Sequence, residues 1–141
     1  MTKTPIRAYM TPSPYTIGAD QTLAVASELM RKHKIRHLPV LRGGRVVGIL
    51  SQRDVALICG LPGVEPTEVP VEDAMTDSVY SVQPETPLDE VAATMAANKY
   101  GAALIVGERD HVIGVFTTVD ALHALADGAP AKKRRAAQPS I

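Results

Sequence analysis

The chain has 141 residues, of which 45% are hydrophobic and 21% are charged, a composition typical of a folded protein that excludes a disordered or fibrous one. Fifteen Lys and Arg balance fifteen Asp and Glu, so the chain lacks the basic excess expected of a protein that binds duplex DNA or an anionic membrane. The single cysteine, Cys59, excludes an internal disulfide, and no window offers the ~18 uninterrupted apolar residues of a membrane span, so we expect a cytoplasmic protein.

Two copies of one sequence unit fill most of the chain. The segment 10–17, with its Met-Thr and Tyr-Thr-Ile motifs, recurs at 75–82 as Met-Thr and Tyr-Ser-Val. The segment 48–54, Gly-Ile-Leu-Ser-Gln-Arg-Asp, recurs at 114–120 as Gly-Val-Phe-Thr-Thr-Val-Asp. Because self-similarity at a fixed period marks a repeat architecture, we expect two structurally equivalent units.

Each copy predicts the same elements after its Met-Thr turn: a short extended segment, an amphipathic helix, two strands joined by a turn, and a final helix. Apolar residues three and four apart indicate the first helix. Thr22 in the first copy, and Thr86 followed by Pro87 in the second, are typical of helix N-caps. The predicted ranges are about 15–17, 23–30, 37–41, 46–50 and 52–59 in the first copy, and 80–82, 88–95, 102–106, 112–116 and 118–125 in the second.

This order predicts an α/β protein made of two β-α-β-β-α repeats. A unit of roughly 60 residues buries too little apolar surface to be secure alone, so we expect the repeats to pack sheet against sheet about a pseudo-twofold axis. Residues 1–60 form the first repeat, 61–70 a linker rich in Pro and Gly, 71–127 the second repeat, and 128–141 a disordered basic tail.

In each copy a strand ending in Gly-x-x-Ser/Thr leads into a helix with Asp three residues later: Ser51 and Asp54 in the first copy, Thr117 and Asp120 in the second. One interpretation is a capping box, in which these side chains satisfy free amides at the helix start. The other is a nucleotide site, since a helix N-terminus attracts phosphate and an Asp carboxylate can accept two hydrogen bonds from a ribose diol. The presence of Asp in both copies favours the second interpretation.

A second feature occurs in the first copy alone. Arg36 and His37 precede Pro39 at the start of a predicted strand, whereas the second copy has Ala102 and Ala103 there and no cation. The two side chains either form a solvated strand end or line one of two unequal clefts for phosphate.

Other candidate sites are weaker. The three histidines outside this strand lack the further ligands of a zinc site. Ser51, His37 and Asp54 have the residue types of a hydrolytic triad, but no oxyanion-hole signature accompanies them, so we expect no enzymatic activity. The cluster 132–135, Lys-Lys-Arg-Arg, is more typical of a solvated tail than of a nucleic-acid contact.

The Met-Thr turns, the segment 35–40 (Ile-Arg-His-Leu-Pro-Val) and the segment 48–54 together resemble the cystathionine-β-synthase (CBS) domain. The resemblance covers about residues 6–126 as a tandem pair, the arrangement known as a Bateman module. It implies an α/β pair whose clefts bind an adenosyl ligand, AMP, ADP or ATP before S-adenosylmethionine or NAD, with no cofactor required. Modules that resemble this one commonly form disc-shaped homodimers through their helices.

The resemblance also implies composite clefts, in which the Ser or Thr and the Asp of one copy face strands of the other. Cleft A then combines Thr117 and Asp120 with Thr16, Ile17, Arg36, His37 and Pro39. Cleft B combines Ser51, Asp54 and Arg53 with Ser81, Val82, Ala102 and Ala103. Since cleft B receives no cation from the second copy, we expect cleft A to be the better nucleotide site.

The sequence therefore predicts a stand-alone regulatory module that senses an adenine nucleotide and signals through a dimer or an unknown partner protein. Two alternatives stay open: a structural interaction module with empty clefts, and nucleic-acid binding through the basic tail. An Asp–diol contact is common to every ribonucleoside, so these residues do not identify the ligand.

Overall fold

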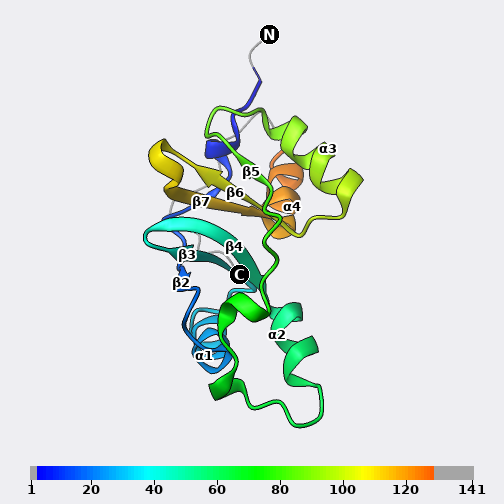
Figure 1. Ribbon diagram of the computed structural model, residues 1–141. Helices are drawn as coiled ribbons and strands as arrows, with labels where there is room; N and C mark the ends of the chain where they lie inside the picture. Colours follow the sequence, from blue (N-terminus) through cyan, green and yellow to red (C-terminus); the bar gives the residue numbers. More distant parts are fainter. Residues whose placement is uncertain (1–2, 129–141) are drawn as a thin grey trace. The chain divides into compact units, whose positions relative to one another are not determined.

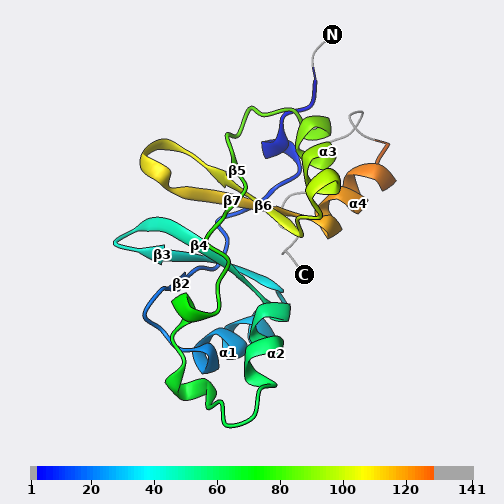
Figure 2. The same cartoon turned by 45° about the vertical axis from the view of Figure 1, so that its right-hand side comes forward.

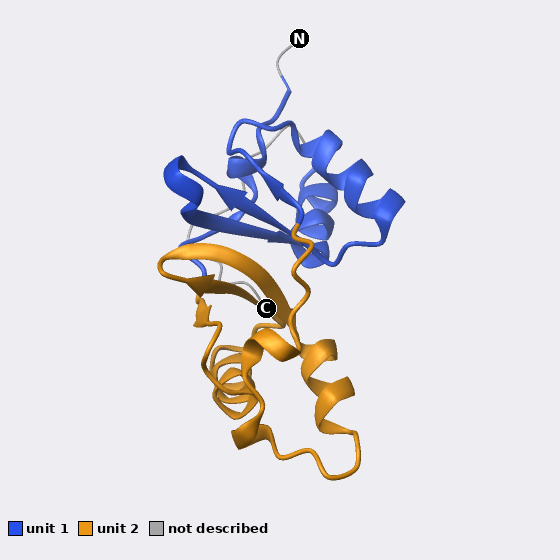
Figure 3. Ribbon diagram, viewed as in Figure 1, with its two compact units in different colours: residues 1–14, 80–140 blue, residues 15–79, 141 orange. Residues whose placement is uncertain are grey.

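The structure, a computed structural model, describes residues 3–128. These residues form two compact units, one comprising Tyr15–Val79 and the other residues 3–14 together with 80–128 (Figure 3). We call them the middle unit and the split unit, because the second is assembled from two separated segments of the chain.

The middle unit is a three-stranded sheet with two helices on one side. Its elements are β2 (Ile17–Gly18), α1 (Leu23–His33), β3 (His37–Arg42), β4 (Arg45–Ser51) and α2 (Gln52–Cys59), followed by the 3-10 helices Pro66–Glu68 and Val71–Asp73. The central strand β3 runs parallel to β2 and antiparallel to β4. Both helices lie on the same side of the sheet (Figures 1 and 2), and Leu38, Val40 and Leu50 are buried in the core that they share with it.

The split unit repeats this arrangement with one additional strand. Its elements are the 3-10 helix Ile6–Ala8, β1 (Thr11–Pro12), β5 (Ser81–Val82), α3 (Leu88–Asn98), β6 (Ala102–Val106), the 3-10 helix Glu108–Asp110, β7 (Val112–Thr117) and α4 (Thr118–Ala126). The sheet order is β1-β7-β6-β5, with β5 parallel to β6. Tyr9, Val91 and Phe116 are fully buried in its core.

Each Met-Thr segment pairs with a strand of the other sequence repeat. Thr11, from the first repeat, pairs with Val115 in β7 of the split unit. Thr76, from the second repeat, forms an isolated bridge to Ile49 in β4 of the middle unit. The compact units therefore do not follow the repeat boundaries in the sequence.

The strands that receive these segments carry glycine at the point of contact. A Cβ added to Gly48 would lie 2.5 Å from the Sδ of Met75. At Gly114 an added Cβ would collide with the side chain of Met10 in the same way. Both glycines are needed because a methionine side chain occupies the space that a larger residue would fill.

The predicted order of strands and helices is confirmed in both units. Thr22 caps α1 as predicted, since its side chain accepts a hydrogen bond from the Val25 amide. The prediction for Thr86 is wrong: Pro87 occupies the N-cap position of α3, and the Thr86 hydroxyl accepts a hydrogen bond from the Gln83 amide. The hydroxyl is thus used in the preceding turn, a local interaction that competes with helix capping.

The segment between the repeats is bonded to the middle unit. The Leu23 amide donates to the carbonyl of Val69 at 2.9 Å, and the Val71 amide donates to the carbonyl of Gln21 at 2.7 Å. Val71 is fully buried in the core of this unit. Part of the expected linker, residues 61–70, is therefore ordered against the start of α1, whereas the predicted basic tail beyond Gly128 lies outside the described residues.

Candidate functional site

The junction between β4 and α2 forms a complete capping box. The Ser51 hydroxyl accepts a hydrogen bond from the Asp54 amide at 3.0 Å, and the Asp54 Oδ2 accepts one from the Ser51 amide at 2.9 Å. The structural interpretation of this motif is thus correct. It does not exclude a ligand, because the box uses one of the two carboxylate oxygens of Asp54.

The junction between β7 and α4 has the same capping box, and here both carboxylate oxygens of the Asp accept hydrogen bonds. The Oδ2 of Asp120 accepts hydrogen bonds from the Thr117 amide at 2.9 Å and from its hydroxyl at 3.3 Å. The Oδ1 of Asp120 accepts a further bond from the hydroxyl of Thr11 at 3.4 Å. Asp120 is only 1% exposed, so both of its oxygens are committed inside the split unit.

The two junctions therefore differ at the second carboxylate oxygen. Asp54 is half-buried, and no residue in 3–128 donates a hydrogen bond to its Oδ1. A carboxylate oxygen in this state can accept a hydrogen bond from a ligand hydroxyl without losing an internal one.

The hairpin brings the predicted cations to this open carboxylate. His37 in β3 is directly opposite Ser51 in β4, and the carbonyl of Arg36 accepts a hydrogen bond from the Gln52 amide at 2.8 Å. Burial lowers the pKa of His37 below its usual range, the nearby Asp54 carboxylate opposes this shift, and the Arg36 charge adds to it. The imidazole of His37 therefore lies within the electrostatic reach of both the Asp54 carboxylate and the Arg36 guanidinium.

Strand alternation puts four of the predicted residues on one face of this sheet. Leu38 and Leu50 point into the core beneath the helices, so their neighbours His37 and Ser51 point to the opposite face. Thr16 and Pro39 share that face, because Ile17, which follows Thr16, pairs with the core residue Val40. The side chain of Ile17 itself is 2% exposed and belongs to the core, so it can offer a ligand only its backbone.

The corresponding face of the split unit carries no cation at the junction. Ala102 is opposite Thr117 in β6 and β7, at the position that His37 has in the middle unit. Ser81 is exposed, while Val82 and Ala103 are core residues. Of the predicted cleft B residues, Arg53 is exposed on the first turn of α2.

Arg36, His37, Ser51 and Asp54 lie in the same compact unit, as expected for residues of one sequence repeat. The resemblance assigns the first two and the last two to different clefts. The composite clefts A and B each join residues of both units, and they stay predictions. The predicted turn at Gly43 and Gly44 is confirmed, and it pairs β3 with β4 so that His37 lies opposite Ser51.

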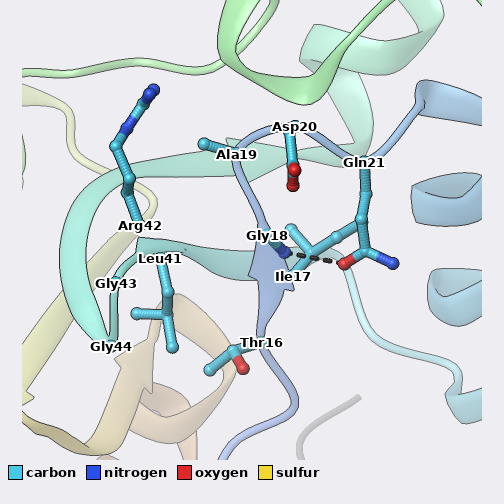
Figure 4. A pocket seen from close by; sticks show the side chains of 10 residues that line it. All are labelled: Thr16, Ile17, Gly18, Ala19, Asp20, Gln21, Leu41, Arg42, Gly43 and Gly44. Atoms are coloured by element: carbon cyan, nitrogen blue, oxygen red, sulfur yellow. Dashed lines mark hydrogen bonds between the residues drawn. The ribbon is translucent and has the colours of Figure 1, made fainter.

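A pocket of about 450 Å³ opens at the other end of the same sheet, beside the turn between β3 and β4 (Figure 4). It is lined by Thr16, Ile17, Gly18, Ala19, Asp20, Gln21, Leu41, Arg42, Gly43 and Gly44. The Gln21 side chain accepts a hydrogen bond from the Gly18 amide at 2.8 Å, as Figure 4 shows. Thr16 and Ile17 line this pocket, but Arg36, His37 and Ser51 do not.

We also searched residues 3–128 for a metal site, a hydrolytic triad and a membrane-spanning helix. They contain no group of three or more His, Cys, Asp and Glu side chains placed to hold a metal ion. The Ser51 hydroxyl is bonded to the Asp54 amide, and no hydrogen bond links it to His37 within the described range. In that part of the chain, no helix is both long and apolar enough to cross a bilayer.

Comparisons with known proteins identify a family and a fold. The family model of the CBS domain matches residues 6–59 and 71–127. The CBS domain-containing protein YhcV of Bacillus subtilis is 27% identical over 115 residues, which cover 82% of this chain and 81% of that protein. The inosine-5'-monophosphate dehydrogenase of Korarchaeum cryptofilum is 32% identical over 108 residues, which cover 77% of this chain but 21% of the enzyme.

A solved structure has the same fold. The CBS domain pair of protein MJ0100, in complex with 5'-methylthioadenosine and S-adenosyl-L-methionine, superposes with a TM-score of 0.81 at 24% identity. The match covers 89% of this chain and 98% of that one. The predicted family resemblance and the predicted α/β fold of two CBS-type repeats are confirmed.

Proposed function

Because the chain belongs to the CBS domain family, we propose that it is a regulatory module that binds an adenosyl ligand of the AMP, ADP or ATP class. The observation that carries the proposal is the open oxygen of Asp54 at a junction where its carboxylate acts on His37, the residue that follows Arg36. The MJ0100 pair, which has the same fold, holds two adenosyl ligands in its crystal structure. That complex supports an adenosyl ligand, while the phosphates of the ligand and the residues that bind it in this chain are our proposal.

The ribose is proposed to bind Asp54. A vicinal diol donates two hydrogen bonds, and a carboxylate with a free oxygen accepts them. The sequence analysis favoured Asp120 for this role, but both oxygens of Asp120 are already bonded and its side chain is 1% exposed. The geometry therefore favours Asp54 as the primary ribose acceptor.

The phosphate is proposed to bind the cations of the same unit. Two amides in the first turn of α2 are already occupied, since Gln52 donates to Arg36 and Asp54 donates to Ser51. Recognition of the phosphate therefore depends on side chains more than on the helix end. Arg36 offers a permanent charge, and His37 gains one when an anion raises its pKa.

The split unit supports the alternative of a structural module for its own half. Its junction has Ala102, and no cation, opposite Thr117. The Oδ1 of Asp120 already accepts a hydrogen bond from the Thr11 hydroxyl. We propose that this half binds ligand more weakly or serves as a scaffold. Nucleic-acid binding through residues 132–135 concerns a segment outside the described residues.

The regulatory signal is proposed to pass through a homodimer. Leu122 and Leu125 on α4 are 63% and 75% exposed, and Leu57 on α2 is 65% exposed. Exposed leucines on the helix that follows the junction of each unit fit a contact surface on that unit. A ligand signals through such a surface when it binds one arrangement more tightly than another.

The experiment is a thermal-shift series with AMP, ATP, S-adenosylmethionine and NAD. A ligand that binds the native state raises the melting temperature, and we expect the largest rise with an adenine nucleotide. Asp54→Asn keeps the size of the side chain and should remove most of the rise, while Asp120→Asn, the matched control, should retain it. No shift with any of the four ligands would contradict the proposal.

A further inference from the structure

We propose that the site of the middle unit prefers nucleoside di- and triphosphates to monophosphates, because uncommitted cations lie beside it. This inference rests on the proposed function and concerns how many phosphates the ligand carries. The cations belong to the segment that joins α1 to β3.

This segment, residues 31–37, reads Arg-Lys-His-Lys-Ile-Arg-His. The corresponding segment of the second repeat, residues 96–102, reads Ala-Ala-Asn-Lys-Tyr-Gly-Ala and holds one cation. The excess of positive charge therefore occurs in the unit whose carboxylate is open. If the fold of the repeat itself required cations in this segment, both repeats would carry them.

Three of these cations form no ion pair within the described residues. Arg31 forms an ion pair with Glu28 at 2.5 Å. Lys32, Lys34 and Arg36 are exposed, and none of them forms an ion pair with any residue in the range 3–128. Their charges are thus available to an anion from solution.

The backbone fixes these cations close to the ligand junction. The Arg36 carbonyl is bonded to the Gln52 amide at the start of α2, so the segment lies directly against the first turn of that helix. Lys34 ends α1 in the left-handed conformation, with φ at 56°, and its Cα lies within about 7 Å of that of Arg36.

A first phosphate is served by Arg36, His37 and the hydroxyl of Ser51. Each further phosphate adds negative charge that Lys34 and Arg53, exposed on the first turn of α2, can neutralise. Exposed ion pairs each change affinity by a few-fold. We expect ATP to bind about tenfold more tightly than AMP, with a difference that shrinks as salt screens the charges.

The test is isothermal titration of the full chain with AMP, ADP and ATP at low and high salt. Lys34→Asn removes the charge and retains a residue that tolerates the left-handed conformation. It should reduce ATP affinity by a few-fold and leave AMP affinity unchanged. The matched control is Lys99→Asn, because Lys99 ends α3 in the same conformation, with φ at 60°, and lies in the split unit.

The outcomes separate this inference from the proposed function. Equal affinities for AMP and ATP in the wild type would overturn the preference and leave nucleotide binding intact. An equal loss of ATP affinity in Lys34→Asn and Lys99→Asn would also overturn it, since the effect would not depend on position. Failure of all three nucleotides to bind would instead refute the proposed function.

Discussion

Thr11 and Asp120 are hydrogen-bonded through their side chains at 3.4 Å, although 109 residues separate them in the chain. The contact forms because the first Met-Thr segment pairs with β7 of the second repeat. It occupies the oxygen of Asp120 that corresponds to the open oxygen of Asp54. One threonine thus distinguishes the two junctions of an otherwise repeated fold.

This contact predicts that Thr11→Val destabilises the protein. Valine keeps the shape of the side chain but removes one hydrogen bond donated to a buried carboxylate, at a cost of about 0.5–1.5 kcal/mol. Thr76→Val is the matched control: Thr76 is exposed, and its side chain forms no hydrogen bond with the described residues, so little change is expected. Urea denaturation followed by circular dichroism measures both, and equal effects would contradict the role assigned to Thr11.

The glycines under the two methionines predict unequal effects of alanine. At Gly48 a new Cβ would meet both the Met75 Sδ at 2.5 Å and the carbonyl oxygen of Thr76 at 2.9 Å. At Gly114 the nearest atoms all belong to the side chain of Met10, which can move more easily than backbone. We expect Gly48→Ala to lower the free energy of unfolding by about 1–3 kcal/mol and Gly114→Ala by less.

A rescue variant tests this explanation. Met10→Ala combined with Gly114→Ala should cost less than the sum of the two single changes, because the shared contact is lost once. If the loss of unfolding free energy in the double variant equals the sum of the two single losses, the Met10 side chain is not what makes Gly114→Ala unfavourable.

His37 predicts a dependence of stability on pH. Its pKa in the folded chain is lowered from 6.5 chiefly by burial, so below that value the unfolded chain binds more protons than the folded one. The contribution of His37 to the free energy of unfolding is therefore fully present above about pH 6.5. It is lost as the pH falls from there through the lowered pKa of the folded chain. His37→Gln should flatten the decline between neutral and mildly acid pH, as measured by urea midpoints.

A control distinguishes this group from the other histidines. His111 is exposed on the split unit, and His111→Gln should leave the pH dependence of the urea midpoint as in the wild type. An identical slope in the wild type and in His37→Gln would remove His37 as its source.

The sequence predicts the local features of this protein well and the long-range ones poorly. The hairpins, the capping boxes and the order of elements follow from residues that are close in the chain, and the structure contains them. The pairing of Thr11 with Val115 joins two strands that are far apart in the chain. Residue patterns within one segment do not indicate which distant strand that segment pairs with. The composite clefts, which the family resemblance implies, join residues of both units and stay a prediction.

The proposed dimer predicts a change in assembly. Leu125 is 75% exposed on α4, so Leu125→Asp should leave the fold intact and shift the protein towards the monomer in sedimentation analysis. Ala93→Asp, at an exposed position on α3, is the control and should not change the assembly. A wild-type chain that sediments as a monomer at every concentration would contradict the dimer.

The central claim is that the open oxygen of Asp54 holds a ribose hydroxyl, and a calorimetric titration with AMP and 2'-deoxy-AMP tests it most directly. The wild type and Asp120→Asn should bind AMP about tenfold or more tightly than the deoxy compound, since hydrogen bonds to charged groups are among the stronger ones. In Asp54→Asn this preference should largely disappear. A preference that survives in Asp54→Asn, or that vanishes in Asp120→Asn instead, would contradict the account.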